Sequence, residues 1–336
     1  MPEDPNDEKW IRLALREARK GIGRTSPNPP VGAVIVRKGK LLGKGFHRKA
    51  GEPHAEIEAI AKVGGSTKGA TIYVTLEPCS TVGKTGACSA AIIEGEFARV
   101  VYAVNDPNTD HAGRVRGIFK RKGIEVTTGV CKDEATELLR PWRKFIETGM
   151  PWVIAKAGIS LDGRMTRPPG ESQWLTNPAA RDDVQKLRSE VDAIIIGAET
   201  LRRDNPMLTL RGKHADGREQ PWRVVLTRSG SVPMDAKLFT DVHHARTLVL
   251  RNKSLGAVLG MLAKRGVVSV LIEGGSQMHA EAFSKGVVDE VCLYQAPLIC
   301  GDDTVPMIGG SLKNSLTIRK ISFKKIGDNL RMRGLV

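Results

Sequence analysis

An α/β fold in two domains is what this sequence predicts. Apolar runs typical of strands alternate with amphipathic helical segments along the chain, a pattern that favours sheets covered by helices. The chain has 336 residues, and domains usually contain roughly 100–200. A helix-stop signal, Gly149-Met150-Pro151, separates two such alternating stretches. We therefore expect one domain at residues 1–149 and a second at residues 150–336.

The expected elements follow from the period of the apolar residues and from the turn signals between them. In the first domain they are a helix at 9–20, a hairpin of strands 31–36 and 41–46, a helix at 54–63, a strand at 71–76, a helix from 88, a strand at 99–104, a helix near 117, a strand at 124–127 and a helix at 132–148. In the second domain, strands at 152–157, 193–197, 223–227, 247–250, 268–273 and 290–294 alternate with helical segments.

Composition and charge restrict the class of protein. The net charge of +15 favours anionic partners, such as phosphorylated metabolites, dinucleotides or nucleic acid. Nucleic acid is disfavoured because aromatic residues make up only 4% and do not alternate with the basic clusters. No apolar run approaches the length of a membrane span, and the polar start MPEDPNDEKW does not resemble a secretory signal. We expect a cytoplasmic protein without a membrane partner.

Three residues have the types and the spacing of a catalytic zinc site. His54 begins a predicted helix, Cys79 follows a predicted strand, and Cys88 begins the next helix. One imidazole and two thiolates suit Zn²⁺, and three protein ligands leave the fourth position open for a reactive water. Glu56, two residues after His54, is placed to take a proton from that water and deliver it to a leaving amino group. The sequence therefore predicts a deaminase of a nitrogen heterocycle.

The alternative for this cluster is a structural zinc site or a set of core residues. The chain has five cysteines, an odd and sparse set that argues against a disulfide framework, and we expect Cys131, Cys292 and Cys300 to be structural. His-Ala-Glu followed by Glu-Pro-Cys and a second Cys is typical of the cytidine-deaminase-like fold. Eight residues separate the two cysteines, where two are usual. We expect that longer loop to reshape the pocket.

At this point the motifs HAE, TLEPCS, GKTGAC and DPN together resemble the bifunctional deaminase–reductase family of riboflavin biosynthesis. KAGISLDGRM, GESQWLT, RDNPMLTLR and LIEGGSQMHAEAF resemble that family's reductase motifs, in the same order, so that the resemblance covers nearly the whole chain. It implies a cytidine-deaminase-like domain, with a mixed sheet and helices on both faces, followed by a dihydrofolate-reductase-like domain. It also implies Zn²⁺ and NADPH as cofactors: a phosphoribosylated diaminopyrimidine is deaminated, and its ribosyl group is then reduced to a ribityl chain.

The resemblance further implies substrate contacts in the deaminase half, from Asn28, His47, Lys84 and Asn108. For three of them an ordinary role stays open: Asn28 as a turn residue, His47 as a packed histidine and Lys84 as a solvated loop lysine. The chain departs from the family at Thr81, where many members have a histidine. The loop from Gly113 to Gly117 also differs, which leaves its alignment open.

In the second half, LIEGGSQMHAEAF reads as a strand, two glycines and a helix start. Such a turn can hold a phosphate group at the helix N-terminus, or it can simply be a tight turn. No G-x-G-x-x-G follows a strand in this half, which argues against a Rossmann fold. By resemblance, the residues lining NADPH are Gly158, Trp174, Thr200, Asp204, Gly275, Ser276, Gln277, Met278, His279, Ala280 and Glu281.

By the same resemblance, Ser172, Arg188, Leu208, Arg211 and Glu273 meet the reductase substrate. Arg188 and Arg211 can grip a phosphate group in a bidentate manner, although surface salt bridges are the alternative. Opening the ribosyl ring requires proton transfer, and the candidates for it are Lys156, Asp204 and Glu273. The family commonly has Asp-Ser where this chain has Thr227-Arg228, so we expect Arg228 to contact the 2′-phosphate of NADPH.

Three functions are compatible with these motifs: the bifunctional riboflavin enzyme, a nucleoside or RNA base deaminase with an unrelated C-terminal domain, and a reductase with a non-catalytic deaminase-like module. The intact zinc set and the reductase motifs favour the first, with a phosphorylated pyrimidine as partner. The sequence leaves a homo-oligomer open.

Overall fold

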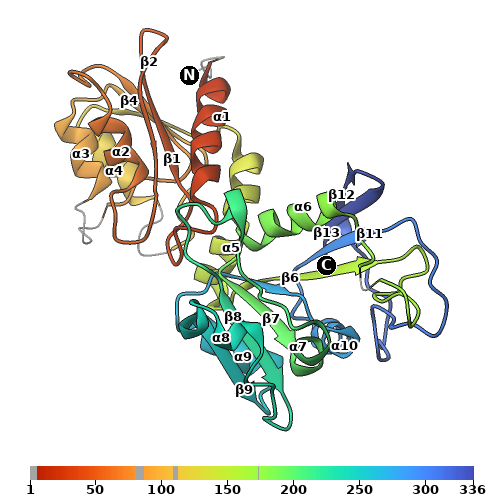
Figure 1. The fold of residues 1–336 in the computed structure, drawn as a ribbon. Helices are drawn as coiled ribbons and strands as arrows, with labels where there is room; N and C mark the ends of the chain where they lie inside the picture. Colours follow the sequence, from red (N-terminus) through yellow and green to blue (C-terminus); the bar gives the residue numbers. More distant parts are fainter. Residues whose placement is uncertain (1–5, 81–86, 109–112, 173) are drawn as a thin grey trace. The chain divides into compact units, whose positions relative to one another are not determined.

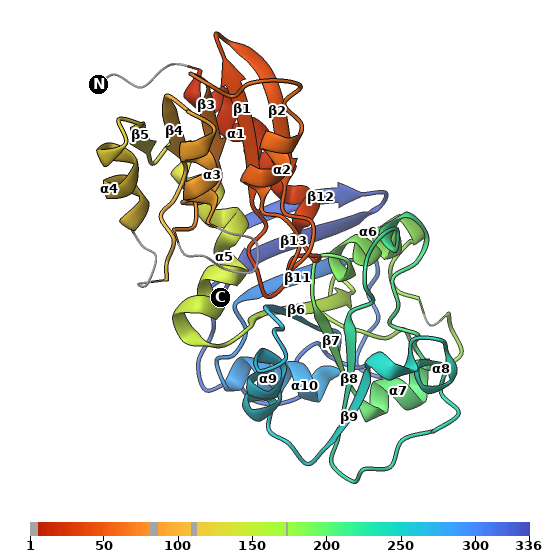
Figure 2. The same ribbon diagram turned by 90° about the vertical axis from the view of Figure 1, so that its left-hand side faces the viewer.

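The computed structural model describes residues 6–80, 87–108, 113–172 and 174–336. The chain divides into two compact units, Met1–Gly149 and Met150–Val336. Each unit is built on a sheet with helices on both faces (Figures 1 and 2), so the expected α/β class is confirmed. Among the described helices, none is both long and apolar enough to cross a membrane.

The first unit has a five-stranded mixed sheet in the order β2-β1-β3-β4-β5. β1 pairs antiparallel with β2 and β3, whereas β3, β4 and β5 run parallel. Figure 1 shows α1 and α5 on one face and α2, α3 and α4 on the other. The elements are α1 (Asp7–Ala18), η1 (Arg19–Gly21), β1 (Gly32–Arg37), β2 (Lys40–Phe46), α2 (Ala55–Ala61), β3 (Thr71–Val74), α3 (Cys88–Glu94), β4 (Arg99–Tyr102), α4 (Arg114–Arg121), β5 (Glu125–Thr128) and α5 (Lys132–Thr148).

The second unit has an eight-stranded sheet in the order β12-β13-β11-β6-β10-β7-β8-β9. From β11 to β9 the strands are parallel, and β13 and β12 join antiparallel at one edge. The elements are β6 (Trp152–Ile159), α6 (Pro178–Arg188), β7 (Ala193–Gly197), α7 (Ala198–Asp204), η2 (Gly212–His214), β8 (Trp222–Thr227), α8 (Lys237–Thr240), η3 (His244–Arg246), β9 (Thr247–Arg251), α9 (Leu255–Ala263), β10 (Ser269–Ile272), α10 (Ser276–Ser284), β11 (Glu290–Gln295), β12 (Arg319–Ile326) and β13 (Asn329–Leu335).

Two apolar layers hold this second sheet. On one face, residues of α6, α7 and α8 pack against the strands, among them Val184, Leu201 and Leu238. On the other face, α9 and α10 contribute residues such as Val258 and Phe283. Because helices cover both faces, the central strands are almost wholly apolar, which is why they read as continuous hydrophobic runs in the sequence.

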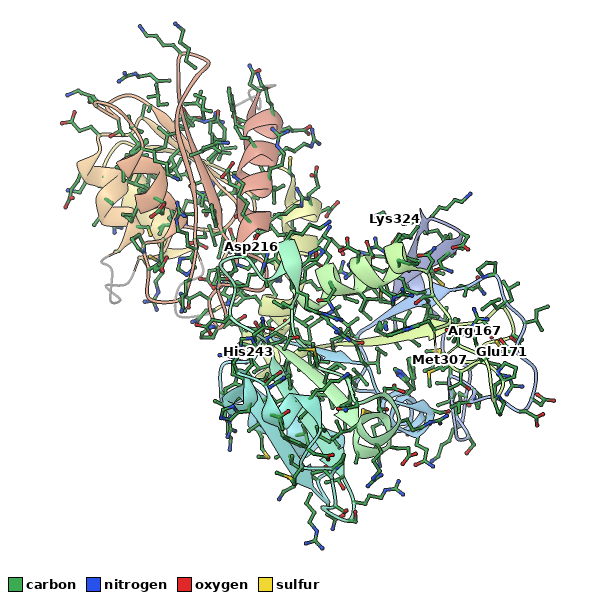
Figure 3. The ribbon with its side chains drawn as sticks, in the orientation of Figure 1. Arg167, Glu171, Asp216, His243, Met307 and Lys324 are labelled. Carbon is green, nitrogen blue, oxygen red and sulfur yellow. The ribbon has the colours of Figure 1, made fainter. Side chains whose placement is uncertain are left out.

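Two loops of the second unit support each other without joining the sheet. Met165 N–H donates to the Val305 carbonyl at 2.7 Å, and Met307 N–H donates to the Gly163 carbonyl at 3.0 Å. Figure 3 labels Met307 near the ion pair of Arg167 and Glu171, whose charged atoms are 3.2 Å apart. The segments 160–171 and 298–309, far apart in sequence, therefore lie side by side.

The predicted strands and helices match the structure to within a few residues at their ends, apart from one hairpin. The sequence pattern does not predict β12 and β13. Nearly every residue of β12 is exposed, and basic residues interrupt its apolar ones. The alternation of buried and exposed residues that identifies a strand is therefore missing from β12.

Candidate active sites

The three predicted zinc ligands come together at one end of the first sheet. His54 is the N-cap of α2 and Cys88 is the first residue of α3. Cys79 lies in the connection after β3, where its sulfur accepts a hydrogen bond from the Cys88 backbone N–H at 3.3 Å. The loop and the two helix starts bring one nitrogen and two sulfur atoms within 4.8 Å of one another.

The spacing of these ligand atoms fits a zinc ion. His54 Nδ1 is 3.2 Å from Cys88 Sγ and 3.6 Å from Cys79 Sγ. A tetrahedral Zn²⁺ with ordinary bond lengths separates a nitrogen and a sulfur ligand by about 3.6 Å. Hydrogen bonding from Cys88, together with His54, lowers the pKa of the Cys79 thiol, while the same pairing raises the pKa of Cys88. The cluster therefore favours a thiolate, which is the form that binds zinc.

Glu56 lies in the first turn of α2, and only 3% of its surface is exposed. Burial, reinforced by the negative charge at Cys79, raises the pKa of its carboxyl to about 7. A carboxyl group with a pKa near neutrality can both accept and release a proton. This is the property that the predicted proton transfer requires.

His47 and Asn28 form a pair beside this cluster. The imidazole of His47 is buried, and its ring lies edge-on to that of His54 at 5.3 Å between centroids. Its Nδ1–H donates to the Pro53 carbonyl at 3.0 Å, so Nε2 accepts from the Asn28 side-chain amide at 3.1 Å. Burial lowers the pKa of His47 and keeps the ring neutral. Both ring nitrogens of His47 therefore form hydrogen bonds within the protein, and the bond from Nε2 orients the Asn28 amide.

Glu77 belongs to the site although its residue type and spacing alone do not predict a role there. Its buried carboxylate accepts hydrogen bonds from the backbone N–H of Asp106 at 3.2 Å and of Gly113 at 3.0 Å. It thereby anchors the connection that carries Asn108, whose own N–H donates to the Asp106 side chain. The sequence signal for it is its place in TLEPC, directly before Pro78 and two residues before Cys79. Lys84 and Thr81 lie outside the described residues.

In the second unit, three predicted residues form a compact charged cluster at the carboxyl end of β10. Arg188 of α6 holds Glu273 with two hydrogen bonds, of 2.6 and 3.0 Å. The Lys156 ammonium lies 3.5 Å from the same carboxylate. Although burial alone would raise it, these two cations lower the pKa of Glu273 to about 2. Glu273 is therefore a fixed anion that holds no proton at neutral pH.

The turn from β10 into α10 has the features of a phosphate seat. A Cβ on Gly274 would lie 2.4 Å from Met278 Sδ, so a larger residue there would require the Met278 side chain to move. A Cβ on Gly275 would lie 3.5 Å from Thr200 Oγ1, which places α7 beside this turn. In the described chain, no acceptor is bound to the backbone N–H of Ser276 or of Gln277. Open amides at a helix N-terminus suit an anion such as a dinucleotide phosphate.

The remaining predicted residues of α10 differ in their exposure. Gln277 and Glu281 are exposed, Ala280 is half-buried and His279 is completely buried. Burial lowers the pKa of His279 to about 4, so its ring is neutral. The Glu281 carboxylate accepts a hydrogen bond from the Leu255 N–H at the start of α9, at 3.5 Å. The hydroxyl of Ser276 donates to the Pro306 carbonyl.

Trp174 and Ser172 lie in the loop between β6 and α6. The indole of Trp174 is 52% exposed and is stacked by the Arg181 guanidinium, 4.8 Å from the ring centroid. Its backbone N–H donates to the Ser172 hydroxyl at 3.2 Å. Gly158, near the carboxyl end of β6, leaves room for Thr176, whose Cγ2 would lie 3.3 Å from an added Cβ.

The segment after α7 carries three more predicted residues. Asp204 is the last residue of α7 and is exposed overall. Partial desolvation by the surrounding protein nevertheless raises the pKa of its carboxyl group. Leu208 is buried and Arg211 is exposed. Arg228, just after β8, is exposed. Gly158, Thr200, Glu273 and Arg228 thus lie at or just after the carboxyl ends of parallel strands, where open α/β sheets bind their ligands.

Comparison with known proteins identifies relatives of both units. Residues 4–104 match the profile of the "Cytidine and deoxycytidylate deaminase zinc-binding region". Residues 151–332 match that of the "RibD C-terminal domain". The riboflavin biosynthesis protein RibD of Bacillus amyloliquefaciens is 38% identical, over 97% of this chain and 95% of its own length. The Escherichia coli protein of the same name is 37% identical, over 88% and 89%.

Solved structures agree over the whole chain. A RibD structure from Acinetobacter baumannii matches with a TM-score of 0.90 and 35% identity, over 98% of both chains. A structure from Thermotoga maritima, described as a diaminohydroxyphosphoribosylaminopyrimidine deaminase/5-amino-6-(5-phosphoribosylamino)uracil reductase, matches with a TM-score of 0.90 and 31% identity, also over 98% of both chains. The resemblance expected from the motifs is therefore confirmed.

Proposed function

Because this chain belongs to the RibD family of bifunctional riboflavin-biosynthesis deaminase–reductases, we propose that its two clusters carry out successive steps on one phosphorylated pyrimidine. The observation that carries the proposal is the joint presence of both clusters. The first unit pairs a His/Cys/Cys set with a buried carboxyl of near-neutral pKa. The second unit holds the Glu273–Arg188–Lys156 cluster beside an open helix N-terminus.

In the deaminase step, His54, Cys79 and Cys88 would hold a zinc ion, and a bound zinc ion would lower the pKa of its water to about 7. Glu56 accepts a proton as the water attacks the amino-bearing carbon, and it donates a proton to the amino group that leaves as ammonia. Its pKa of about 7 makes both transfers feasible at one pH. Burial of Glu56 excludes bulk water from that proton.

Recognition of the pyrimidine falls to the residues around this cluster. His47 fixes the Asn28 amide through its Nε2, so that Asn28 can present its carbonyl oxygen to an edge of the base. Asn108, on the connection anchored by Glu77, is proposed for another edge. Lys84 is proposed for the ribose phosphate or a pyrimidine carbonyl, on the basis of the family resemblance.

In the reductase step, NADPH, when bound, would supply a hydride to C1′ of the opened ribosyl chain. We assign proton transfer to Lys156 and Asp204. Glu273 instead anchors Arg188 and Lys156, because a carboxyl with a pKa of about 2 has no proton to donate at neutral pH. Nη1 of Arg188 has no partner among the described residues and is proposed to contact the substrate together with Arg211, Leu208 and Ser172.

For the cofactor, the open amides of Ser276 and Gln277 are proposed to hold the phosphates. Thr200, whose Oγ1 would lie 3.5 Å from a Cβ on Gly275, is proposed to line them with the rest of the turn. On the basis of the family resemblance, Gly158, Trp174 and Asp204 are proposed to line the remainder of NADPH. The 2′-phosphate is proposed to lie at Arg228. Arg251, paired with Thr227 across β8 and β9, packs against Gly230 in the same turn and adds a second positive charge.

The direct test gives the purified protein the phosphoribosylated diaminopyrimidine with and without NADPH. Ammonia release without NADPH, followed by NADPH oxidation when the cofactor is added, is the expected result. Oxidation that precedes ammonia release, or ammonia release from an RNA substrate at comparable efficiency, would contradict the proposal. Competition by RNA at physiological salt tests the nucleic-acid alternative separately.

Because its proposed substrate and NADPH are phosphorylated metabolites, we propose that the protein is located in the cytoplasm.

The members of each cluster come from one chain, so the proposed chemistry does not require a second copy. A homo-oligomer is equally compatible with these assignments.

A further inference from the structure

We propose that Arg223, a fully buried arginine, is a positioning residue for the reductase site. It fixes the orientation of the peptide group between Met207 and Leu208, so that the Leu208 N–H points towards the substrate. The proposal rests on the proposed function, in which Leu208 contacts the reductase substrate. Arg223 lies on β8 with 0% of its surface exposed. A buried arginine needs partners for its charge and its N–H groups.

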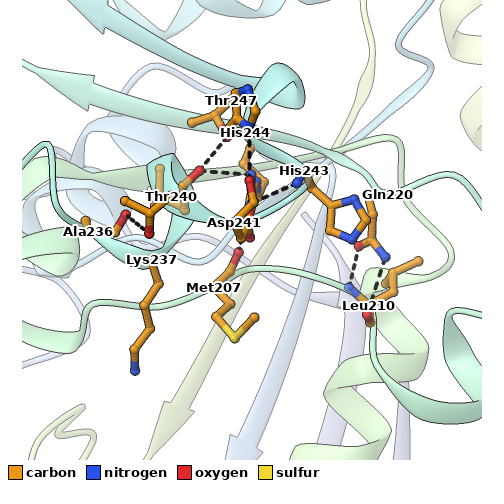
Figure 4. A network of polar contacts seen from close by, with 12 residues as sticks. Met207, Leu210, Gln220, Ala236, Lys237, Thr240, Asp241, His243, His244 and Thr247 are labelled. Atoms are coloured by element: carbon orange, nitrogen blue, oxygen red, sulfur yellow. Dashed lines mark hydrogen bonds and ion pairs between the residues drawn. The ribbon is translucent and has the colours of Figure 1, made fainter.

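Those partners come from two separate segments. Arg223 forms two hydrogen bonds with the carboxylate of Asp241, of 2.5 and 2.9 Å. The same two nitrogens also donate to the Met207 carbonyl at 3.0 Å and to the Leu238 carbonyl at 2.9 Å. Figure 4 shows Asp241 with His243 on one side and Met207 on the other. Arg223 thus joins the segment after α7 to the region around α8.

The segment from Asn205 to Leu210 pairs with none of the described strands and is held by side chains. At its start, the Asn205 side chain accepts the Lys237 N–H at 2.9 Å. At its end, Gln220 bonds both the N–H and the carbonyl of Leu210, at 2.6 and 3.4 Å, as Figure 4 shows. Arg223 holds the middle. The backbone between two predicted site residues, Asp204 and Arg211, is therefore fixed at three points.

Leu208 has a backbone that its side chain disfavours. Its φ is 54°, in the left-handed region, which costs free energy for any residue with a branched side chain. Leu208 is only 2% exposed, yet none of the described residues forms a hydrogen bond with its peptide N–H or carbonyl. A buried peptide group without a partner in the protein points to a ligand that supplies one.

The geometry of the peptide links these observations. The Met207 carbonyl and the Leu208 N–H belong to one planar unit and point in opposite directions. When Arg223 binds the carbonyl, it therefore aims the Leu208 N–H away from Arg223, as a donor to an oxygen of the substrate. Without the guanidinium group, the peptide between Met207 and Leu208 can rotate, and the Leu208 N–H no longer points in a fixed direction.

The test uses Arg223→Lys in the full-length protein. Lysine keeps the charge opposite Asp241, but one ammonium cannot reach both carboxylate oxygens and two carbonyls. We expect kcat/KM for the deaminated substrate to fall about 10- to 100-fold, as for a small misplacement of a binding group. The loss should lie mainly in the KM for that substrate, with the KM for NADPH and the rate of ammonia release unchanged. Arg246→Lys, at an outer ion pair with Glu219, is the matched control. It should change neither kcat/KM nor KM for the deaminated substrate.

If Arg223→Lys does not fold, the double variant Arg223→Met with Asp241→Leu replaces the buried ion pair by apolar side chains, a change that proteins often tolerate. The same rise in substrate KM is expected from it. An unchanged substrate KM in a folded variant, or a fall in kcat with both KM values unchanged, would overturn the proposal. Wild-type reduction is measured first, so that absence of the activity itself is recognised as a failure of the proposed function.

Discussion

Replacing Arg188 by methionine is expected to destabilise the reductase unit by about 3 kcal/mol at pH 7. The two cations around Glu273 lower its pKa from 4.5 to about 2. Since one pKa unit corresponds to about 1.4 kcal/mol, the ionised pair stabilises the folded unit by about 3 kcal/mol. Arg188 makes two hydrogen bonds to the carboxylate, whereas Lys156 lies 3.5 Å away, so most of this stabilisation depends on Arg188.

The sign of the pH dependence follows from the lowered pKa. The contribution of Glu273 is fully present above pH 4.5, and in the wild type it is lost as the pH falls from 4.5 towards 2. In Arg188→Met the buried carboxyl keeps little compensation, so its pKa rises. The variant should therefore differ from the wild type most at neutral pH and least at low pH.

Pulse proteolysis in urea, with peptides of each unit followed by mass spectrometry, measures the stability of the two units separately. The deaminase unit should be unaffected in Arg188→Met. Arg167→Met, which breaks the more exposed pair with Glu171, is the control and should cost about 1 kcal/mol or less. A loss below 1 kcal/mol for Arg188→Met at pH 7, or a difference that grows as the pH falls, would refute this reasoning.

Three further predictions concern the two activities. Glu56→Gln should reduce ammonia release at least about 100-fold, because the proton carrier is lost. NADPH oxidation with the already deaminated compound should stay near the wild-type rate, and retained deamination would exclude the role given to Glu56. Removing zinc with a chelator should abolish ammonia release, and added Zn²⁺ should restore it in the wild type but not in Cys88→Ser; activity that survives complete metal removal would count against the site. Arg228→Ala should raise the KM for NADPH about tenfold or more with little effect on NADH, as expected for one charged contact to phosphate, and equal effects on both cofactors would remove Arg228 from the 2′-phosphate site.

Much of the architecture could be predicted from local sequence alone. Strands such as β7 and helices such as α5 carry their own periodic signals, and their predicted bounds agree with the structure. The hairpin of β12 and β13 could not be found in this way, because a strand exposed on both faces has no alternating pattern. The zinc ligands were accessible to sequence reading because each lies at a motif whose residue types carry the chemistry.

What the sequence by itself determined is therefore the set of chemical groups: a nitrogen and two sulfur ligands, a carboxyl beside them, and a glycine turn for an anion. What only the tertiary structure decided is the state of those groups. Burial raises the pKa of Glu56 to about 7, whereas two cations lower that of Glu273 to about 2, although both are glutamates near the end of an element. The pairing of Arg223 with Met207 and Asp241 likewise depends on segments that meet only in the fold. A side chain's ionisation and direction are set by its neighbours in space, and residues that are distant along the chain supply most of them.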